Sequence, residues 1–395
     1  MSDIETILIV GGGLAGAKAA EALRKDGYEG RVVIVGAEPH RPYIRPPLSK
    51  EYLRGDGDLD KVYVQPEAWY AENRVELELA ATVTALDPAA HEVVLADGRR
   101  LGFDRLLLAT GSEPRRLPVP GADLAGVRYL RTIDDSDALR EAAGSASKVV
   151  VVGGGWIGAE VAASVRQLGR DVTVVSDTVV LLERVLGPEV GGIYDAVHAE
   201  HGVRLVPNQQ VVALHGSDGA VEAVETADGT RIDADLVVVG IGATPRTALA
   251  EAAGLAVDGG ILVDEHLETS VPGIYAAGDI ASAIHPAFGG RLRVEHWDNA
   301  RRQGAAAARN MLGHDEPYGR VPYFYSDQFE LGMEYAGYAP KWDEVVFRGD
   351  VAKREFVAFW VLEGRVRAGM NVNVWKVNAA ISALVASGSQ VDHGR

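Results

Sequence analysis

Two short glycine runs have the spacing of a dinucleotide-binding loop. The first reads GGGLAG at residues 11–16, and the second reads GGGWIG at residues 153–158. The fingerprint glycines are Gly11, Gly13 and Gly16 in the first run and Gly153, Gly155 and Gly158 in the second. Glycine lets a backbone approach a pyrophosphate, and the unpaired N–H groups at a helix N-terminus favour the anion. The runs therefore predict two dinucleotide sites, provided that each run joins a strand to a helix.

The residues after each loop bear on which dinucleotide binds. Glu38 follows a second apolar segment, where a carboxylate can accept hydrogen bonds from an adenosine ribose. In the second unit, the end of the second strand reads Ser176, followed by Asp177, although NAD-specific units carry an acid there. Serine tolerates a 2′-phosphate, but no basic pair follows it, and Arg184 is the nearest cation. We expect NADH at the second loop, with NADPH as the alternative.

A repeated pattern of elements positions both loops. An apolar segment at 6–10 precedes the first loop, and an alanine-rich helical segment to about residue 25 and an apolar segment at 31–35 follow it. The same order recurs at 148–152, to about residue 168, and at 171–175. Similar strands with Gly-turn-Pro-Arg exits follow at 104–115 and 235–246. This internal repeat of a strand–helix–strand unit predicts two parallel α/β sheets. Aromatic alternation from about residue 318 predicts an antiparallel sheet, and residues 373–386 a helix.

Composition excludes several classes of function. The chain has 395 residues with 39 Lys+Arg against 56 Asp+Glu, a net charge of −17, which disfavours nucleic acid and anionic lipid as partners. No run of about 18 apolar residues and no basic leader is present, so we expect a cytoplasmic protein without a membrane partner. The chain has no cysteine, which excludes a thiol relay and a cluster held by its own thiolates. His285 and His296 lack ligand partners at useful spacing, so we expect no metal.

Seven motifs together carry a family resemblance over nearly the whole chain. They are GGGLAG (11–16), RPPLSK (45–50), LLLATGSEPR (106–115), GGGWIGAE (153–160), GIYAAGD (273–279), VEHWDNA (294–300) and YFYSDQFELG (323–332). In these motifs the chain resembles the FAD-dependent ferredoxin reductases of bacterial oxygenase systems. That family includes the putidaredoxin reductase type and is related to the apoptosis-inducing-factor flavoproteins.

The resemblance implies an architecture and an activity. It implies an α/β, glutathione-reductase-like fold with two Rossmann-like domains and a C-terminal α+β domain. The FAD domain would comprise 1–108 and 230–315, the NAD(P) domain 109–229, and the C-terminal interface domain 316–395. Hydride would pass from NADH to N5 of FAD, and electrons would then pass singly to an acidic ferredoxin. Alternative acceptors are rubredoxin, a quinone or a radical, and a signalling flavoprotein is the alternative of another class. The quinone is disfavoured because the tail lacks a basic amphipathic anchor.

The resemblance also assigns roles to individual residues. The prolines of RPPLSK would hold an extended backbone and Ser49 would cap a short helix, so that Arg45 and Lys50 point at the flavin. Lys50 would lie near N5 and pair with Glu160, bridging the two nucleotide domains. Asp279 would bond the ribityl or pyrophosphate side of FAD, a role compatible with capping the next helix. Further expected cofactor contacts are Leu14, Ala15, Val83, Ala109, Thr110, Gly111, Arg131, Trp156, Ile157, Gly242, Val294, Glu295 and Trp297.

Two expectations concern the exit of electrons. Tyr325 stands where many relatives carry a tryptophan at the flavin edge, so it would shield the ring or else belong to the core of the C-terminal domain. An acidic ferredoxin needs a locally basic docking face on this acidic chain. We expect that face to include Arg293, Arg301, Arg302 and Lys376, with Arg291 nearby; the alternative is that these are scattered, solvated charges.

Overall fold

The computed structural model describes residues 4–390, which divide into two compact units. The first unit comprises the described residues up to Ile44 together with Asp60–Glu113 and Pro245–Phe324. The second comprises Arg45–Leu59, Pro114–Thr244 and the described residues from Tyr325 onward. Each unit is therefore assembled from separate stretches of chain.

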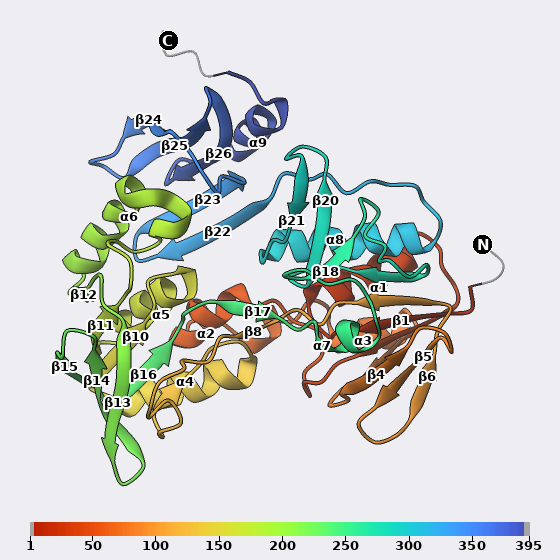
Figure 1. The fold of residues 1–395 in the computed structure, drawn as a ribbon, viewed down its shortest axis with the longest axis horizontal. Coiled ribbons are helices and arrows are strands. Elements are labelled where there is room, and N and C mark those ends of the chain that lie inside the picture. The colour runs from red at the N-terminus through yellow and green to blue at the C-terminus, as the bar shows by residue number, and fades with distance from the viewer. Residues whose placement is uncertain (1–3, 391–395) are drawn as a thin grey trace. The chain divides into compact units, whose positions relative to one another are not determined.

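A parallel five-stranded sheet forms the centre of the first unit (Figure 1). Its order is β19-β7-β1-β2-β3, with β1 at Thr6–Val10, β2 at Arg31–Val35, β3 at Val75–Glu78, β7 at Arg105–Leu108 and β19 at Ile274–Ala276. The central strands are continuous runs of buried Val, Ile and Leu, as expected for a parallel sheet covered on both faces. Helix α1 (Leu14–Lys25) packs against α8 (Trp297–Met311). Only glycine fits at Gly304, because a Cβ there would lie 2.1 Å from the carbonyl oxygen of Ala15.

Smaller elements complete the first unit. Antiparallel strands β4 (Val83–Asp87), β5 (Glu92–Leu95) and β6 (Arg100–Gly102) form one three-stranded sheet. Strands β18 (Ile261–Val263), β20 (Ala281–His285) and β21 (Gly290–Leu292) form another. The short helices are α3 (Glu67–Glu72) and α7 (Ala248–Ala252), and a 3-10 turn spans Leu59–Lys61.

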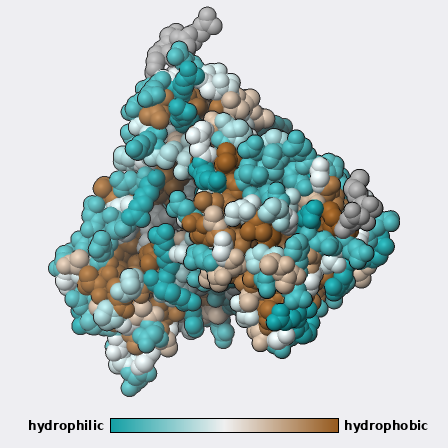
Figure 2. All heavy atoms as spheres, turned by 45° about the vertical axis from the view of Figure 1, so that its right-hand side comes forward, coloured by the Kyte–Doolittle hydropathy of each residue, from teal (hydrophilic) through white to brown (hydrophobic). Residues whose placement is uncertain are grey.

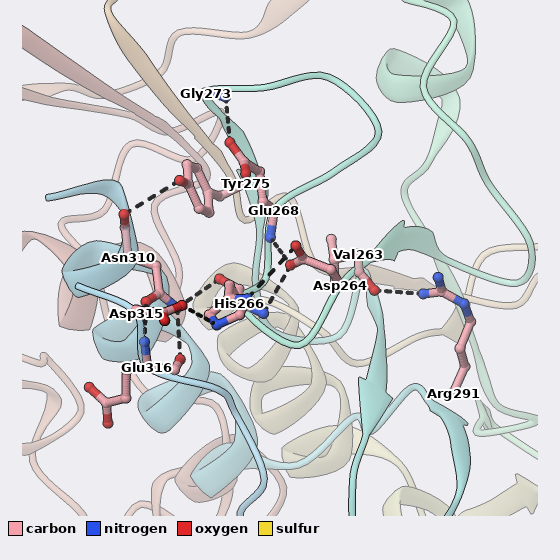
Figure 3. A network of polar contacts seen from close by, with 10 residues as sticks. All are labelled: Val263, Asp264, His266, Glu268, Gly273, Tyr275, Arg291, Asn310, Asp315 and Glu316. Carbon is pink, nitrogen blue, oxygen red and sulfur yellow. Dashed lines mark hydrogen bonds and ion pairs between the residues drawn. The ribbon is translucent and has the colours of Figure 1, made fainter. Parts of the chain in front are cut away.

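A polar network fixes the chain after α8 to the first unit (Figure 3). The His266 Nε2 lies 2.9 Å from Asp315 Oδ1, and Asn310 Nδ2 donates to the backbone oxygens of His266 and Glu316. On the other side of the same loop, Asp264 Oδ1 accepts the backbone N–H of His266. The segment that leads from α8 toward the C-terminal strands is thus held by the side chain of His266, from the loop before β19, and by that of Asn310 on α8.

The second unit contains a second parallel sheet of five strands (Figure 1). Its order is β12-β11-β10-β16-β9, with β9 at Val127–Arg128, β10 at Lys148–Val152, β11 at Asp171–Val175, β12 at Arg204–Val206 and β16 at Leu236–Val239. Its helices are α4 (Ile133–Ser145), α5 (Trp156–Gln167) and α6 (Glu183–Glu200), and β13 (Val211–Ser217), β14 (Ala220–Thr226) and β15 (Arg231–Asp233) form an antiparallel sheet. Thr132 and Asp135 form a capping box that starts α4.

The C-terminal strands form an antiparallel sheet of order β22-β23-β26-β25-β24. These strands are β22 (Tyr323–Gln328), β23 (Leu331–Gly337), β24 (Glu344–Asp350), β25 (Glu355–Leu362) and β26 (Arg365–Val372), followed by α9 (Asn378–Ser387). Trp360 on β25 is fully buried, and its Nε1 donates to the Leu186 carbonyl of α6 at 3.1 Å. The sheet is therefore bonded to the helix layer of the second unit.

The predicted fold class is confirmed, since two parallel sheets and a C-terminal antiparallel sheet are present. The strands expected at 6–10, 31–35, 148–152 and 171–175 have those bounds in the structure. The domain boundary expected at residue 230 lies differently, because β16 pairs with β10 and the passage back to the first unit occurs between Thr244 and Pro245. Strand β8 (Ser112–Pro114) spans the point where the chain leaves the first unit, and β17 (Ala243–Pro245) spans the point where it returns.

Within residues 4–390, no helix combines the length and the apolar composition needed to cross a membrane. Figure 2 shows a face on which hydrophilic residues are widespread and hydrophobic ones gather in smaller patches.

Candidate dinucleotide sites and a buried lysine–glutamate pair

The first glycine loop has the backbone geometry that a pyrophosphate site needs. Gly11 has φ 130°, and a Cβ there would lie 2.1 Å from the Ala109 carbonyl oxygen. A Cβ on Gly16 would lie 2.3 Å from the Gly11 carbonyl oxygen, which holds α1 close to the loop. By contrast, a Cβ on Gly13, the N-cap of α1, would meet no atom within 4 Å. The loop is tight where the protein packs on itself and open where an anion would approach the helix.

Other predicted residues of the first unit lie beside this loop. Ala109, whose carbonyl oxygen faces Gly11, begins the turn Ala109-Thr110-Gly111, and Thr110 Oγ1 donates to the Arg246 carbonyl at 3.1 Å. Gly278, which precedes Asp279, comes close to Ala15 in α1, since a Cβ on Gly278 would lie 3.3 Å from the Ala15 Cβ. The structure therefore brings Asp279 to the same helix N-terminus as the glycine loop.

The remaining predicted contacts of the first unit are placed as follows. The Glu38 carboxylate accepts a hydrogen bond from the Tyr43 hydroxyl. Val294 is buried, and its carbonyl accepts from Asn299 Nδ2 at 2.9 Å, while Glu295 pairs with Arg293 at 2.5 Å. Trp297 begins α8 and lies under the guanidinium of Arg301, and Val83 begins β4. The residues of this unit thus fit FAD around the first loop, with one acid, Glu38, after β2 and another, Asp279, beside the helix N-terminus.

The second glycine loop repeats the geometry of the first. Gly153 has φ 111° and a Cβ there would lie 2.4 Å from the Gly240 carbonyl oxygen, while a Cβ on Gly158 would lie 2.0 Å from the Gly153 carbonyl oxygen. Gly155 is the N-cap of α5, and a Cβ on it would meet no atom within 4 Å. Trp156 and Ile157 begin α5, and Ile157 is 44% exposed. These residues fit a second dinucleotide.

Hydroxyl groups, rather than an acid, occupy the end of β11. Ser176 is buried, its Oγ lies 2.7 Å from Thr178 Oγ1, and the Thr178 hydroxyl donates to the Val180 carbonyl. Arg184 pairs with Asp177 at 2.7 Å, and its side chain is 71% exposed. The next cation along the chain after Ser176 is therefore paired with the acid that follows Ser176.

The segment RPPLSK brings a lysine to a buried carboxylate. Lys50 Nζ lies 3.7 Å from Glu160 Oε1, and both side chains are buried. Both carboxylate oxygens of Glu160 also accept hydrogen bonds, one from Ser49 Oγ at 2.5 Å and the other from Ser326 Oγ at 2.6 Å. Lys50 Nζ lies 4.8 Å from the centre of the Tyr325 ring. Burial of a charged pair is tolerated here because each carboxylate oxygen has a donor.

Three details of this segment differ from expectation. Pro46–Ser49 form a 3-10 helix instead of an extended segment, because the fixed φ of proline also suits the first turn of a helix. Ser49 does not cap the helix Glu51–Arg54; its hydroxyl bonds Glu160 instead. Lys50 and Glu160 also lie in the same compact unit. Sequence reasoning missed the bonds of Ser49 and Ser326 to Glu160, although each serine is adjacent to a residue that it singled out.

The other predicted residues of the second unit are placed as follows. Arg45 donates a hydrogen bond to the backbone carbonyl of Arg131, and the Arg115 side chain lies within 4 Å of a Cβ built on Gly242. Burial raises the pKa of Tyr325 to about 12, so its hydroxyl keeps its proton at neutral pH. Among the described residues, no cluster of three or more His, Asp or Glu side chains is arranged to hold a metal ion.

Comparisons with known proteins decide the family. Residues 5–304 match the family described as pyridine nucleotide-disulphide oxidoreductase, and residues 323–395 match the reductase C-terminal family. The chain belongs to the pyridine nucleotide-disulphide oxidoreductase family. It is 39% identical to rhodocoxin reductase of Rhodococcus erythropolis, over 97% of this chain and 90% of that protein. It is 38% identical to putidaredoxin reductase CamA of Pseudomonas putida, over 94% of this chain and 90% of the relative.

Solved structures agree with these relatives. The ferredoxin reductase for the CYP199A2 system from Rhodopseudomonas palustris superposes with a TM-score of 0.95 at 36% identity, covering 98% of this chain and 96% of that one. The reductase in the covalent putidaredoxin reductase–putidaredoxin complex superposes with a TM-score of 0.94 at 37% identity, covering 98% and 94%. The resemblance to ferredoxin reductases is confirmed, and FAD with NAD(P)H is the cofactor pair of this family. The disulphide of the family description has no counterpart here, because the chain has no cysteine.

Proposed function

We propose that this chain is an FAD-dependent NAD(P)H:ferredoxin oxidoreductase that supplies an oxygenase through a small iron–sulfur protein. The observation that carries the proposal is the pair of equally built glycine loops in a chain without cysteine. Two dinucleotide sites suit hydride transfer from a nicotinamide to a flavin. Without a thiol relay, the electrons must leave the flavin directly for an external acceptor. A cytoplasmic location belongs to the proposal, since NAD(P)H must reach the second loop.

The proposal assigns a role to each group of residues. Gly11, Gly13 and Gly16, with the amides of Leu14 and Ala15, would hold the FAD pyrophosphate; Glu38 and Asp279 would orient its two ends. The second loop would hold the nicotinamide dinucleotide. When bound, the flavin accepts hydride and releases single electrons. Lys50, held by Glu160, places a positive charge in the second unit, where it would stabilise electron density on the reduced ring.

The domain assignment is proposed on the same basis. The first unit would bind FAD, and the part of the second unit built on β10, β11 and α5 would bind NAD(P)H. Residues 316–395 would form the C-terminal interface domain. The match of residues 323–395 to the reductase C-terminal family supports this separate part.

The partner is proposed to be an acidic ferredoxin. The names of the relatives and the putidaredoxin complex support a partner of this type. The docking residues would be Arg293, Arg301, Arg302 and Lys376. Arg301 and Arg302 both bond the nearly buried Asp298 carboxylate at 2.6 Å, so together they present less charge than two free cations. Arg291 donates hydrogen bonds to the backbone carbonyls of Val263 and Ser282.

The decisive experiment is anaerobic reduction of the purified protein. We expect it to be yellow with noncovalent FAD, to be bleached by NADH, and to pass electrons to an acidic ferredoxin encoded near its gene. Transfer only to rubredoxin, a quinone or a radical would support the alternative acceptors. Rapid reduction with no turnover on any acceptor would instead favour a signalling flavoprotein.

A second test concerns Lys50. Lys50→Ala should slow flavin reduction by about tenfold and lower the flavin potential, because it removes a buried cation beside the proposed ring position; tenfold corresponds to about 1.4 kcal/mol of transition-state free energy. Stopped-flow absorbance and a dye-coupled potential measure the two effects. Unchanged kinetics and potential would remove Lys50 from the flavin site.

A further inference from the structure

A line of buried polar side chains leads away from Glu160 on the side opposite Ser49. Ser326 Oγ donates to Glu160 Oε1 at 2.6 Å, and Gln328 Nε2 donates to Ser326 Oγ at 3.2 Å. Gln328 Oε1 in turn lies 3.0 Å from His198 Nε2. All four residues lie in the second unit and are nearly inaccessible to solvent: Glu160 is 6%, Ser326 2%, Gln328 1% and His198 0% exposed.

The hydrogen bonds of this line run in one direction. Because the amide nitrogen of Gln328 donates to Ser326, its oxygen faces the histidine and must accept. His198 Nε2 therefore carries the proton, and its Nδ1 is bare. Nδ1 is buried without a hydrogen-bond partner, which suits the unprotonated nitrogen of this tautomer. Each donor thus points toward the next residue and finally toward the carboxylate.

We propose that Ser326, Gln328 and His198 are positioning residues that fix the Glu160 carboxylate and, through it, the Lys50 ammonium. The inference rests on the proposed function, in which Lys50 acts at the flavin. A chain of aligned hydrogen bonds polarises its members in the same sense, so it stabilises the negative charge at its end better than isolated donors would. Three separate elements are joined in this way, since His198 lies on α6, Ser326 and Gln328 on β22, and Glu160 on α5.

Burial keeps the distal end of the line neutral. The protein interior lowers the pKa of His198 to about 4, so the ring carries a single proton at neutral pH. Phe329 contacts the His198 ring edge-on at a centroid distance of 5.2 Å, and the same phenyl ring stacks on His201 at 3.9 Å. Glu330 pairs with both His201 and Arg354. A neutral histidine has one proton to donate, and the line uses it.

The first test reads the tautomer directly. Imidazole ¹⁵N NMR of the protein, with or without flavin, should show His198 protonated at Nε2 and bare at Nδ1 at pH 7. Gln328→Leu, which keeps the volume but removes the acceptor, should abolish that fixed tautomer. A wild-type His198 protonated at Nδ1 would overturn the inference, because the line would then point the wrong way.

The second test separates positioning from folding. Ser326→Ala and Gln328→Leu should each lower the limiting rate of flavin reduction by about tenfold, equivalent to about 1.4 kcal/mol, with the NADH dissociation constant unchanged. Ser326→Thr, which keeps the hydroxyl, should restore most of the rate. The matched control is Trp360→Phe, which removes another buried hydrogen bond between the C-terminal sheet and α6 without touching the line.

The outcomes distinguish this inference from the proposed function. If wild-type protein is not reduced by NADH, the proposed function fails whatever the tautomer. If wild-type protein is reduced normally but Ser326→Ala and Gln328→Leu match it, the positioning role fails alone. Equal slowing of flavin reduction in Trp360→Phe would also overturn the positioning role. The cause would then be the loss of packing between α6 and the C-terminal sheet, which both kinds of variant weaken.

Discussion

The two glycine loops share their backbone and differ in the residues that follow. In both, the first glycine has a positive φ and lies against a carbonyl oxygen, the third lies against the first, and the middle one is open. The first unit then presents Glu38, whereas the second presents Ser176 with its hydroxyl bonded to Thr178. The two loops therefore share one backbone geometry, and we expect the residue after the second strand to decide which ribose each unit accepts.

The largest effects on cofactor binding are expected at the middle glycine of each loop, Gly13 or Gly155, where a Cβ meets no protein atom. Gly13→Ala should fold normally, because a Cβ there meets no atom within 4 Å, but it should weaken FAD binding by about a hundredfold, or about 2.7 kcal/mol. Gly155→Ala should retain FAD and raise the KM for NADH by a similar factor. Flavin release and steady-state kinetics measure these effects. As a contrast, Gly11→Ala should not fold, because its Cβ would collide with the Ala109 carbonyl.

If Gly13→Ala keeps its flavin with unchanged affinity, the first loop does not bind the pyrophosphate. Loss of FAD from Gly155→Ala alone would exchange the roles of the two loops.

Each unit also holds a histidine whose pKa is strongly lowered by burial, and acid should destabilise both units. Burial lowers the pKa of His198 in the second unit and of His296 in the first to about 4. Unfolding returns each ring toward its usual pKa of about 6.5, so the unfolded chain binds more protons and stability falls as pH drops from about 6.5 toward 4. From pH 7 to pH 5 we expect a loss of about 2 kcal/mol per histidine in urea unfolding of the apoprotein.

His296→Asn should reduce this loss without abolishing it, since His198 and the buried His285, whose pKa burial also lowers, would remain. The same pH slope in wild type and variant would mean that His296 titrates normally in the folded protein.

The residue after β11 tests which nicotinamide dinucleotide, NADH or NADPH, the second loop prefers. Wild-type protein should have a higher kcat/KM for NADH than for NADPH, because Asp177 already pairs with Arg184 and no second cation follows Ser176 directly in the chain. Ser176→Glu, which places an acid directly after β11, should increase this preference by about tenfold, or about 1.4 kcal/mol. Arg348→Ala, at an exposed arginine of β24, serves as the control. A tenfold preference for NADPH in the wild type would instead assign the 2′-phosphate to Arg184.

The smallest effect is expected at the surface. Reversal of Arg301 and Arg302 to glutamate should raise the KM for an acidic ferredoxin by about threefold at low salt and leave reduction by NADH intact, because exposed charges act mainly by steering. The shared Asp298 reduces the effect. A KM that depends neither on salt nor on the double reversal would remove this face from consideration.

The sequence predicted the parts of the molecule that depend on local pattern. Both loops, four strands with their bounds and the antiparallel C-terminal sheet followed from glycine spacing and apolar runs. The boundary near residue 230 was placed too early, because β16 resembles β7 in sequence and only its pairing with β10 assigns it to the second sheet. The Ser326 and Gln328 bonds were missed because they join residues more than a hundred positions away, and no local pattern marks such contacts.

The interleaving of the two units has a consequence for synthesis on the ribosome. The outer strand β19 completes the first sheet only when Ile274–Ala276 has emerged, although β1 is among the first residues made. Helix α8, which packs on α1 through Gly304, comes later still. Since domains fold as units during translation, the nascent N-terminal strands must wait with an open sheet edge while the chain of the second nucleotide loop is being made. The second parallel sheet, whose strands all lie between Val127 and Val239, is therefore complete first.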